Sequence, residues 1–299
     1  ASDVYKRQAD GTGNSLNNLI LGTSDANHIR GLDGDDTLNA GDGNDTIGGG
    51  SGDDVFIGGG GIDTADFAGD ASALVYLRLS GPQNTWQGRD SFTGIENLGG
   101  SNSFDRFFGD DAANILDGRS GDDKLYGGGN SDTLIGGQGN DFFHGGADAD
   151  TIIFAGDQAV IVDIVATTAV GQGTDTLGGV ENITGSNGND EIRGNAWANV
   201  LNGAGGHDVI VGRGGSDTLT GGAGSDRFVF ANFEGNDRII DFQDGVDRIQ
   251  IGGPTTGIND LTIVNWGTSG SVVSWGAGTT IAVMGVSAAQ LTASDFILV

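Results

Sequence analysis

The chain has 299 residues with 41 acidic and 13 basic side chains, so its formal net charge is −28. This charge excludes a nucleic-acid-binding protein, which needs a cationic face. Glycine fills 59 positions, about three times its ordinary share, whereas proline fills only two, which excludes collagen-like and proline-rich chains. The chain contains no cysteine, which excludes disulfides and thiolate metal sites. The longest apolar stretch, around residues 159–170, is interrupted by Asp163, so we expect no transmembrane segment.

The first residues look artificial. The only methionine is Met284, so Ala1 is not a natural translation start, and residues 3–8 resemble the translated end of a sequencing-library adapter. We therefore expect residues 1–8 to be an adapter artefact and exclude them from fold reasoning. We also expect the natural protein to extend further upstream.

A repeat of nine residues dominates the rest of the chain. Rows of nine, counted from Gly13, Gly100 and Gly185, number 17 in all. Their first residue is glycine in all but one row, their sixth is always Asp or Asn, and their eighth is a large hydrophobe in all but one. The sixth-position aspartates are Asp36, Asp45, Asp54, Asp63, Asp105, Asp123, Asp132, Asp141, Asp150, Asp190, Asp208, Asp217 and Asp226. The sixth-position asparagines are Asn18, Asn27, Asn114 and Asn199.

The rows fall into three blocks separated by two connectors. Blocks and connectors alternate as residues 9–65, 66–99, 100–153, 154–184 and 185–228. The connectors contain alternating apolar runs that are typical of strands. These runs are Val75, Leu77, Leu79 and Val160, Val162, Ile164. The period breaks after residue 228, and we interpret residues 229–299 as a β-rich terminal cap.

The spacing of the repeat predicts cation sites. Six glycine-rich residues can turn, because glycine accepts positive φ, and the remaining three form a strand whose central side chain points inward. Two rows make a coil of 18 residues, and stacked coils put residues i and i+18 about 4.8 Å apart, so that Asp36 lies beside Asp54. A cation midway between two coils would lie about 2.4 Å from each level, which is a calcium–oxygen distance. Hard oxygen ligands favour calcium over zinc or copper.

Several calcium ions are therefore expected. Both members are aspartate in seven i, i+18 pairs: 36/54, 45/63, 105/123, 123/141, 132/150, 190/208 and 208/226. The rows with asparagine lose a charge, and we expect their sites to be weak or empty.

The nine-residue pattern resembles the calcium-binding nonapeptide of RTX (hemolysin-type) proteins, G-G-x-G-x-D-x-U-x. Residues 127–135 and 221–229 are close matches. The resemblance implies an all-β fold, a right-handed parallel β-roll (β-solenoid) in three blocks with a β-rich C-terminal cap. It also implies that each ion is held by two sixth-position aspartates and by main-chain carbonyls of both turns. One such site would use Leu32, Gly34, Asp36, Gly49, Ser51 and Asp54.

The C-terminal segment resembles a second feature of secreted proteins. Residues 235–242 and 293–299 look like the cap and tail of serralysin-type proteins. This resemblance implies a signal for the type I (ABC-transporter) secretion machinery and a secreted, extracellular location. Because a glycine-rich acidic chain has little core to stabilise it, we expect calcium binding to drive folding outside the cell.

No catalytic constellation stands out. The motifs H-E-x-x-H and G-x-S-x-G are absent, and His28, His144 and His207 take three different, variable repeat positions. A paired-acid site is also disfavoured, because the connector acids recur as structural repeats, which favours capping or calcium contact. These acids are Asp90, Glu96, Asp175 and Glu181.

The sequence therefore predicts a non-enzymatic, calcium-binding repeat region of a secreted bacterial protein. One alternative is a fragment of a secreted enzyme, a serralysin-type protease or a polysaccharide-modifying enzyme, whose catalytic domain lay upstream. Another is an adhesin spacer with cell-surface or glycan contact. The four tryptophans could line a carbohydrate site, although scattered aromatics are more often packing or isolated exposure. They are Trp86, Trp197, Trp266 and Trp275.

Overall fold

The computed structural model describes residues 3–6, 10–69, 71–231, 234–253, 257–276 and 279–299. The described residues form β-strands, two short 3-10 helices and no α-helix, which confirms the predicted all-β class. The chain divides into two compact units, residues 1–150 and 151–299.

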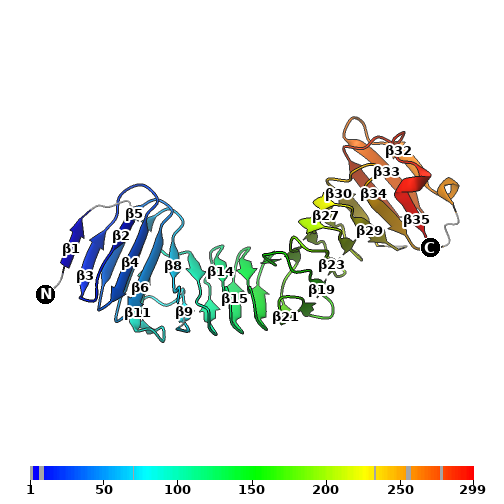
Figure 1. The fold of residues 1–299 in the computed structure, drawn as a ribbon. Helices are drawn as coiled ribbons and strands as arrows, with labels where there is room; N and C mark the ends of the chain where they lie inside the picture. The colour runs from blue at the N-terminus through cyan, green and yellow to red at the C-terminus, as the bar shows by residue number, and fades with distance from the viewer. Residues whose placement is uncertain (1–2, 7–9, 70, 232–233, 254–256, 277–278) are drawn as a thin grey trace. The chain divides into compact units, whose positions relative to one another are not determined.

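The first unit is a stack of parallel strands (Figure 1). One sheet holds β1 (Asp3–Lys6), β3 (Asn18–Leu21), β5 (Thr37–Asp42), β7 (Val55–Gly60), β11 (Arg89–Thr93) and β10 (Gln83–Asn84) in that order. The second holds β2 (Asp10–Thr12), β4 (His28–Asp33), β6 (Thr46–Ser51), β8 (Thr64–Asp66), β12 (Asn97–Gly99), β14 (Ile115–Asp117) and β16 (Thr133–Ile135). A third run holds β9 (Leu74–Tyr76), β13 (Arg106–Phe108), β15 (Lys124–Gly128) and β17 (Phe142–Gly146).

The second unit continues the same architecture. One run holds β18 (Thr151–Ile153), β22 (Asn182–Thr184), β24 (Val200–Asn202), β27 (Thr218–Thr220), β30 (Asn236–Ile239), β34 (Thr279–Met284), β33 (Gly270–Trp275) and β32 (Thr262–Asn265). The other holds β35 (Phe296–Leu298), β31 (Arg248–Ile251), β29 (Arg227–Phe230), β26 (Val209–Val211), β23 (Glu191–Arg193), β19 (Ile161–Asp163), β20 (Thr168–Val170) and β21 (Thr174–Gly178). The short strands β25 (Gly205–Gly206) and β28 (Ala223–Gly224) pair separately, and the 3-10 helices are η1 (Ile258–Asp260) and η2 (Ala293–Asp295).

The strand register confirms the predicted coil of 18 residues. Leu38 pairs with Phe56 in the first unit, and Ile192 pairs with Ile210 in the second. The eighth-position side chains point inward and are almost fully buried. Each coil contributes two of these side chains, so the core is narrow. Burying each one contributes about 1.5–3 kcal/mol. The fold is a parallel β-roll.

The first connector belongs to the roll. Strand β11 pairs with β7, and the ring of Phe92 stacks on that of Phe56 with 4.8 Å between centroids. The alternation around Val75 predicts a longer strand than the structure has. Strand β9 ends at Tyr76, and Leu79 lies in a turn whose N–H donates to the Tyr76 carbonyl.

The parallel strand pairing continues across residue 228, the predicted boundary between the third repeat block and the cap. Leu219 pairs with Ile239 and Phe228 with Ile249, at offsets of 20 and 21 residues. The coils lengthen there, so the nine-residue period disappears from the sequence while the roll continues. At the other end, Asp3–Lys6 forms β1 beside β3, and the adapter origin of residues 1–8 stays a prediction.

Candidate metal sites

The stacked aspartates form hydrogen-bonded ladders. In each step, one carboxylate oxygen accepts the main-chain N–H of the residue one coil earlier, as when Asp54 Oδ1 accepts from Asp36 at 2.8 Å. All seven aspartate pairs predicted from the sequence show this contact. Their predicted stacking is therefore confirmed.

The ladders run beyond the repeat blocks. The N–H of Asp54 donates to Asp90 at 2.8 Å, so this connector acid ends a ladder. In the second unit, Asp217 donates to Asp237 and Asp226 to Asp247, both at 2.9 Å. Sequence reasoning missed these last two residues because their offset is not 18. Each of them stands two residues before a buried isoleucine, a local D-x-I signal that could have found them.

The second oxygen of most ladder carboxylates is buried without a hydrogen-bond partner. This holds, among the described residues, for Oδ2 of Asp36, Asp45, Asp54, Asp63, Asp123, Asp132, Asp208, Asp217, Asp226 and Asp237. A buried polar atom left unsatisfied costs about 1–3 kcal/mol, and more if it is charged. A cation bound beside these oxygens would remove this repeated cost, so the donor set fits a cation site.

We call these buried Oδ2 atoms without a hydrogen-bond partner the orphan oxygens. They border a space that the glycines at the first position of each row keep open. A Cβ at Gly31 would lie 2.1 Å from Asp36 Oδ2 and 2.6 Å from the carbonyl oxygen of Gly49. A Cβ at Gly203 would lie 2.2 Å from Asp208 Oδ2 and 2.6 Å from the next glycine carbonyl. A carboxylate and a main-chain carbonyl of the following coil therefore meet at one point. These are hard oxygen ligands of the type that calcium prefers.

The ligand set predicted for one ion comprises Leu32, Gly34, Asp36, Gly49, Ser51 and Asp54. The structure brings Asp36 and Gly49 to a common space, and Asp54 stands next along the same ladder. The Ser51 carbonyl accepts the N–H of Gly34 at 2.8 Å, which leaves one lone pair on that oxygen. Within the described ranges, no three His, Cys, Asp or Glu side chains surround a common point. The assignment of these six residues as ligands stays a prediction.

Burial raises the pKa of the ladder carboxylates. Desolvation, helped by the neighbouring Asp105 and Asp141, raises the pKa of Asp123 to about 8. Desolvation likewise raises the pKa of Asp208 to about 7, although the N–H from the previous coil lowers it in part. At neutral pH such carboxylates require either a proton or a cation. The residues present therefore fit calcium.

Two of the predicted ligands are already satisfied by serine. Asp105 Oδ2 accepts the N–H of Ser101 at 2.6 Å and its hydroxyl at 3.1 Å. Asp190 accepts the N–H of Ser186 at 2.6 Å and its hydroxyl at 2.9 Å. These aspartates open the second and third blocks, and serine holds the second position of both rows. Their oxygens are less available to an ion than the orphan oxygens elsewhere.

Arginine supplies a cation near the start of the same two blocks, in the Gly100 row of the second block and in the Gly194 row of the third. Arg213 donates to the carbonyl of Gly194 at 2.7 Å, and Arg119 donates to that of Gly100. Each guanidinium also pairs with a connector carboxylate. Both arginines therefore reach the first-position glycine carbonyl of the coil before, the type of oxygen that borders the calcium space elsewhere.

The asparagine rows begin ladders. In all four, the amide oxygen accepts the main-chain N–H four residues earlier at 2.7–2.8 Å. The amide nitrogens of Asn114 and Asn199 donate to the carbonyls of Glu96 and Glu181 at 2.7 and 2.8 Å. An amide that both donates and accepts in this way offers no anionic oxygen. That these sites are weak or empty stays a prediction.

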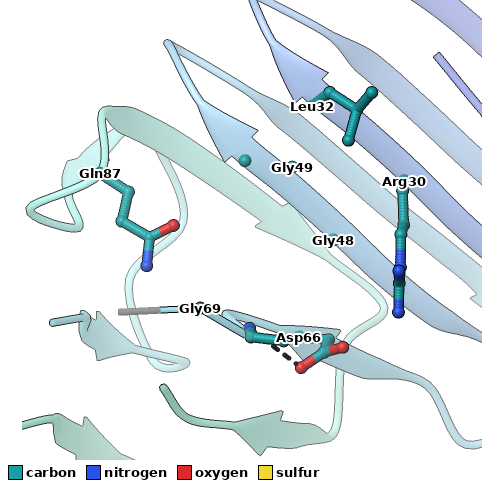
Figure 2. A pocket seen from close by; sticks show the side chains of 9 residues that line it. Arg30, Leu32, Gly48, Gly49, Asp66, Gly69 and Gln87 are labelled. Atoms are coloured by element: carbon teal, nitrogen blue, oxygen red, sulfur yellow. Dashed lines mark hydrogen bonds between the residues drawn. The ribbon is translucent and has the colours of Figure 1, made fainter. Parts of the chain in front are cut away.

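A cavity of about 290 Å³ opens on the outer surface of the first block, with Arg30, Asp66 and Gln87 around it (Figure 2). Gly48 lies in register between Arg30 and Asp66, so its missing side chain opens the space. The cavity is lined by none of the orphan carboxylates. It shares Leu32 and Gly49 with the predicted calcium ligand set.

Of the histidines, His207 lies close to a ladder carboxylate: burial raises the pKa of Asp226, and the nearby charge of His207 acts to lower it in part. His28 accepts a hydrogen bond from Arg30, and His207 accepts the N–H of Ser225, both at 2.9 Å. Trp275 is buried in the cap, whereas Trp197 is 75% exposed.

These features define a class of protein: a β-roll whose turns stack carboxylates suited to calcium. The family model of the RTX calcium-binding nonapeptide repeat (4 copies) matches residues 12–47, 31–65, 90–125, 99–134, 126–158, 175–210 and 198–228. The matches together cover more than half of the chain. The chain belongs to this family, and its repeats bind calcium ions.

No curated protein matches the chain. Among solved structures, the crystal structure of the extracellular lipase LipA from Serratia marcescens is similar at 18% identity and a TM-score of 0.28. The match covers 71% of this chain and 41% of the lipase, so the chain spans less than half the length of that protein. None of the helices in the described part of the chain has the length and hydropathy needed to cross a membrane.

Proposed function

We propose that the chain is a calcium-triggered folding module of a secreted bacterial protein. The observation that carries this proposal is the series of buried carboxylate oxygens without a hydrogen-bond partner. At Asp36, Asp132 and Asp208, the orphan oxygen would hold an ion together with a glycine carbonyl of the next coil.

Charge explains why folding would wait for calcium. The chain carries a net charge of −28, and its ladders bring carboxylates together inside the roll. Without a cation, burial and repulsion oppose this arrangement, and the narrow core offers little to offset them. The free energy of ion binding then becomes free energy of folding. Extracellular calcium modules respond at about 10⁻⁴–10⁻³ M, so the chain would stay unfolded in the cytosol.

Secretion is the finer part of the proposal. The C-terminal residues that resemble a type I secretion signal form η2 and β35, the last elements of the second unit. An unfolded chain would pass through the ABC-transporter channel and fold after export. The module itself would act without a catalytic centre, as a part of a longer enzyme or adhesin.

Circular dichroism of the full chain in chelator and in about 10⁻³ M calcium tests the coupling. We expect a disordered spectrum in chelator and a β spectrum in calcium. Magnesium at the same concentration is the control, because it demands octahedral geometry and dehydrates reluctantly. Equal β content in chelator and in calcium would refute the proposal.

A further inference from the structure

The outer face of the third strand run of the first unit carries aromatic and basic side chains. Its outward-pointing positions form two columns across β9, β13, β15 and β17, and we call this surface the aromatic strip. The strip consists of Leu74, Tyr76, Arg106, Phe108, Lys124, Tyr126, Phe142 and His144. None of them is acidic, although the chain has 41 acidic residues.

Aromatic rings stack along one column of the strip. Tyr76 and Phe108 lie with ring centroids 4.3 Å apart and planes 6° apart, and Phe108 and Tyr126 follow at 4.5 Å and 7°. Their faces cover one another, so ring edges are left facing outward. The edge of an aromatic ring carries the positive part of its quadrupole. The column therefore favours an anionic partner.

The second column carries unpaired cations. Arg106 and Lys124 are in-register neighbours on β13 and β15, where like charges destabilise a sheet. Within the described residues, neither forms an ion pair. The guanidinium of Arg106 lies 5.0 Å from the ring centroid of Phe108 and 5.8 Å from that of Tyr126, and its Nε is buried without a hydrogen-bond partner. Two such charges in so acidic a chain indicate an external anion.

We propose that the aromatic strip binds an acidic polysaccharide, a sugar polymer bearing carboxylate or sulfate groups. The cations would pair with its anionic groups, and the tyrosine hydroxyls and His144 would donate to its oxygens. This proposal goes beyond calcium-triggered folding and does not depend on the route of export.

The shape of the strip favours a polymer over a membrane. The strip is two side chains wide, and its four strands span about 14 Å at 4.8 Å per strand. A flat anionic bilayer would also meet other parts of a chain whose net charge is −28, and would be repelled by them. A single polymer chain would meet the strip alone, because charges beyond about 8 Å are screened at physiological ionic strength.

Binding of the calcium-loaded full chain to immobilised carboxymethyl-dextran tests the proposal, with unmodified dextran as the neutral surface. We expect binding to the charged polymer only, with affinity that falls as salt rises. The double variant Arg106→Gln, Lys124→Gln should lose about tenfold or more in affinity. Its circular dichroism in calcium should match that of the parent chain, since both side chains lie on the outer face.

Arg227→Gln is the matched control. Arg227 also has an arginine, Arg248, as its in-register neighbour, but it lies in the second unit and outside the aromatic strip. This variant should bind as the parent does. Equal binding to both dextrans, or unchanged binding of the double variant, would overturn the proposal. Binding to phosphatidylglycerol vesicles with the same dependence on Arg106 and Lys124 would overturn it in favour of a lipid surface.

Discussion

The guanidinium of Arg213 holds both carboxylate oxygens of Asp163, 50 residues away in the sequence, at 2.8 and 2.7 Å. The same guanidinium donates to the carbonyl of Gly194 at 2.7 Å. The hydrogen bonds from Arg213 lower the pKa of Asp163 to about 2. The contact ties the second connector to the third repeat block without any metal.

Replacing Arg213 with glutamine should destabilise the second unit by about 2 kcal/mol, because hydrogen bonds between charged, partly buried groups are lost. Urea unfolding in saturating calcium measures the loss. Arg193→Gln is the control, since its guanidinium lies 4.0 Å from Asp163 and is more exposed. A loss as large in the control as in Arg213→Gln would show that the bidentate contact is not the cause.

The calcium-free chain should gain β structure in acid. Burial raises the pKa of Asp54 to about 7 and that of Asp123 to about 8, against about 3.9 in an unfolded chain. The folded state therefore binds more protons, so its stability is fully present below pH 4 and is lost as pH rises through 7 to 8. Circular dichroism in chelator from pH 4 to 9 should show falling β content. A rise over this range would contradict the prediction.

Calcium affinity should depend on an orphan carboxylate and much less on a serine-bound one. In Asp123→Asn, the amide oxygen can still accept the N–H of Asp105, but the anionic charge is lost. Calorimetry should show fewer bound ions or a weaker affinity. Asp105→Asn is the matched change, because Ser101 already satisfies that carboxylate. If both variants lose calcium equally, the distinction between the two kinds of aspartate is wrong.

Glycine is required where coils approach closely. A Cβ at Gly50, whose φ is +97°, would lie 1.8 Å from the carbonyl oxygen of Leu32 on the coil before. Gly50→Ala should therefore cost about 2 kcal/mol or more, from backbone strain and from displaced neighbours. At Gly129, the nearest atom to a Cβ would be at 3.6 Å, so Gly129→Ala should be tolerated. Thermal unfolding in calcium compares the two.

The nine-residue period predicted stacked coils of 18 residues, because each row offers one turn and one inward hydrophobe, and the resemblance to RTX proteins implied that these coils form a β-roll. The period also predicted which aspartates are neighbours, since a parallel register fixes the offset at 18. It did not predict Asp237 and Asp247 as the last members of two ladders, because the coils lengthen in the cap.

The roles of Asp105 and Asp190 could not be read from the period. Both match the repeat, and only the three-dimensional structure shows serine satisfying their carboxylates. The aromatic strip could not be predicted from the period for a related reason. Its rings come from positions that vary between rows, and they form a column only when the coils are stacked.

The ladders give the roll a polarity, because in every step the amide belongs to the earlier coil and the carboxylate to the later one. Trimming coils from the N-terminal side would leave carboxylates without their N–H donors, whereas trimming from the C-terminal side would leave main-chain N–H groups without their carboxylate acceptors. The cap, which contributes Asp237 and Asp247, is thus a template onto which preceding coils are laid one after another. The coils of the second unit should accordingly fold in order from the C-terminal end toward the N-terminal end.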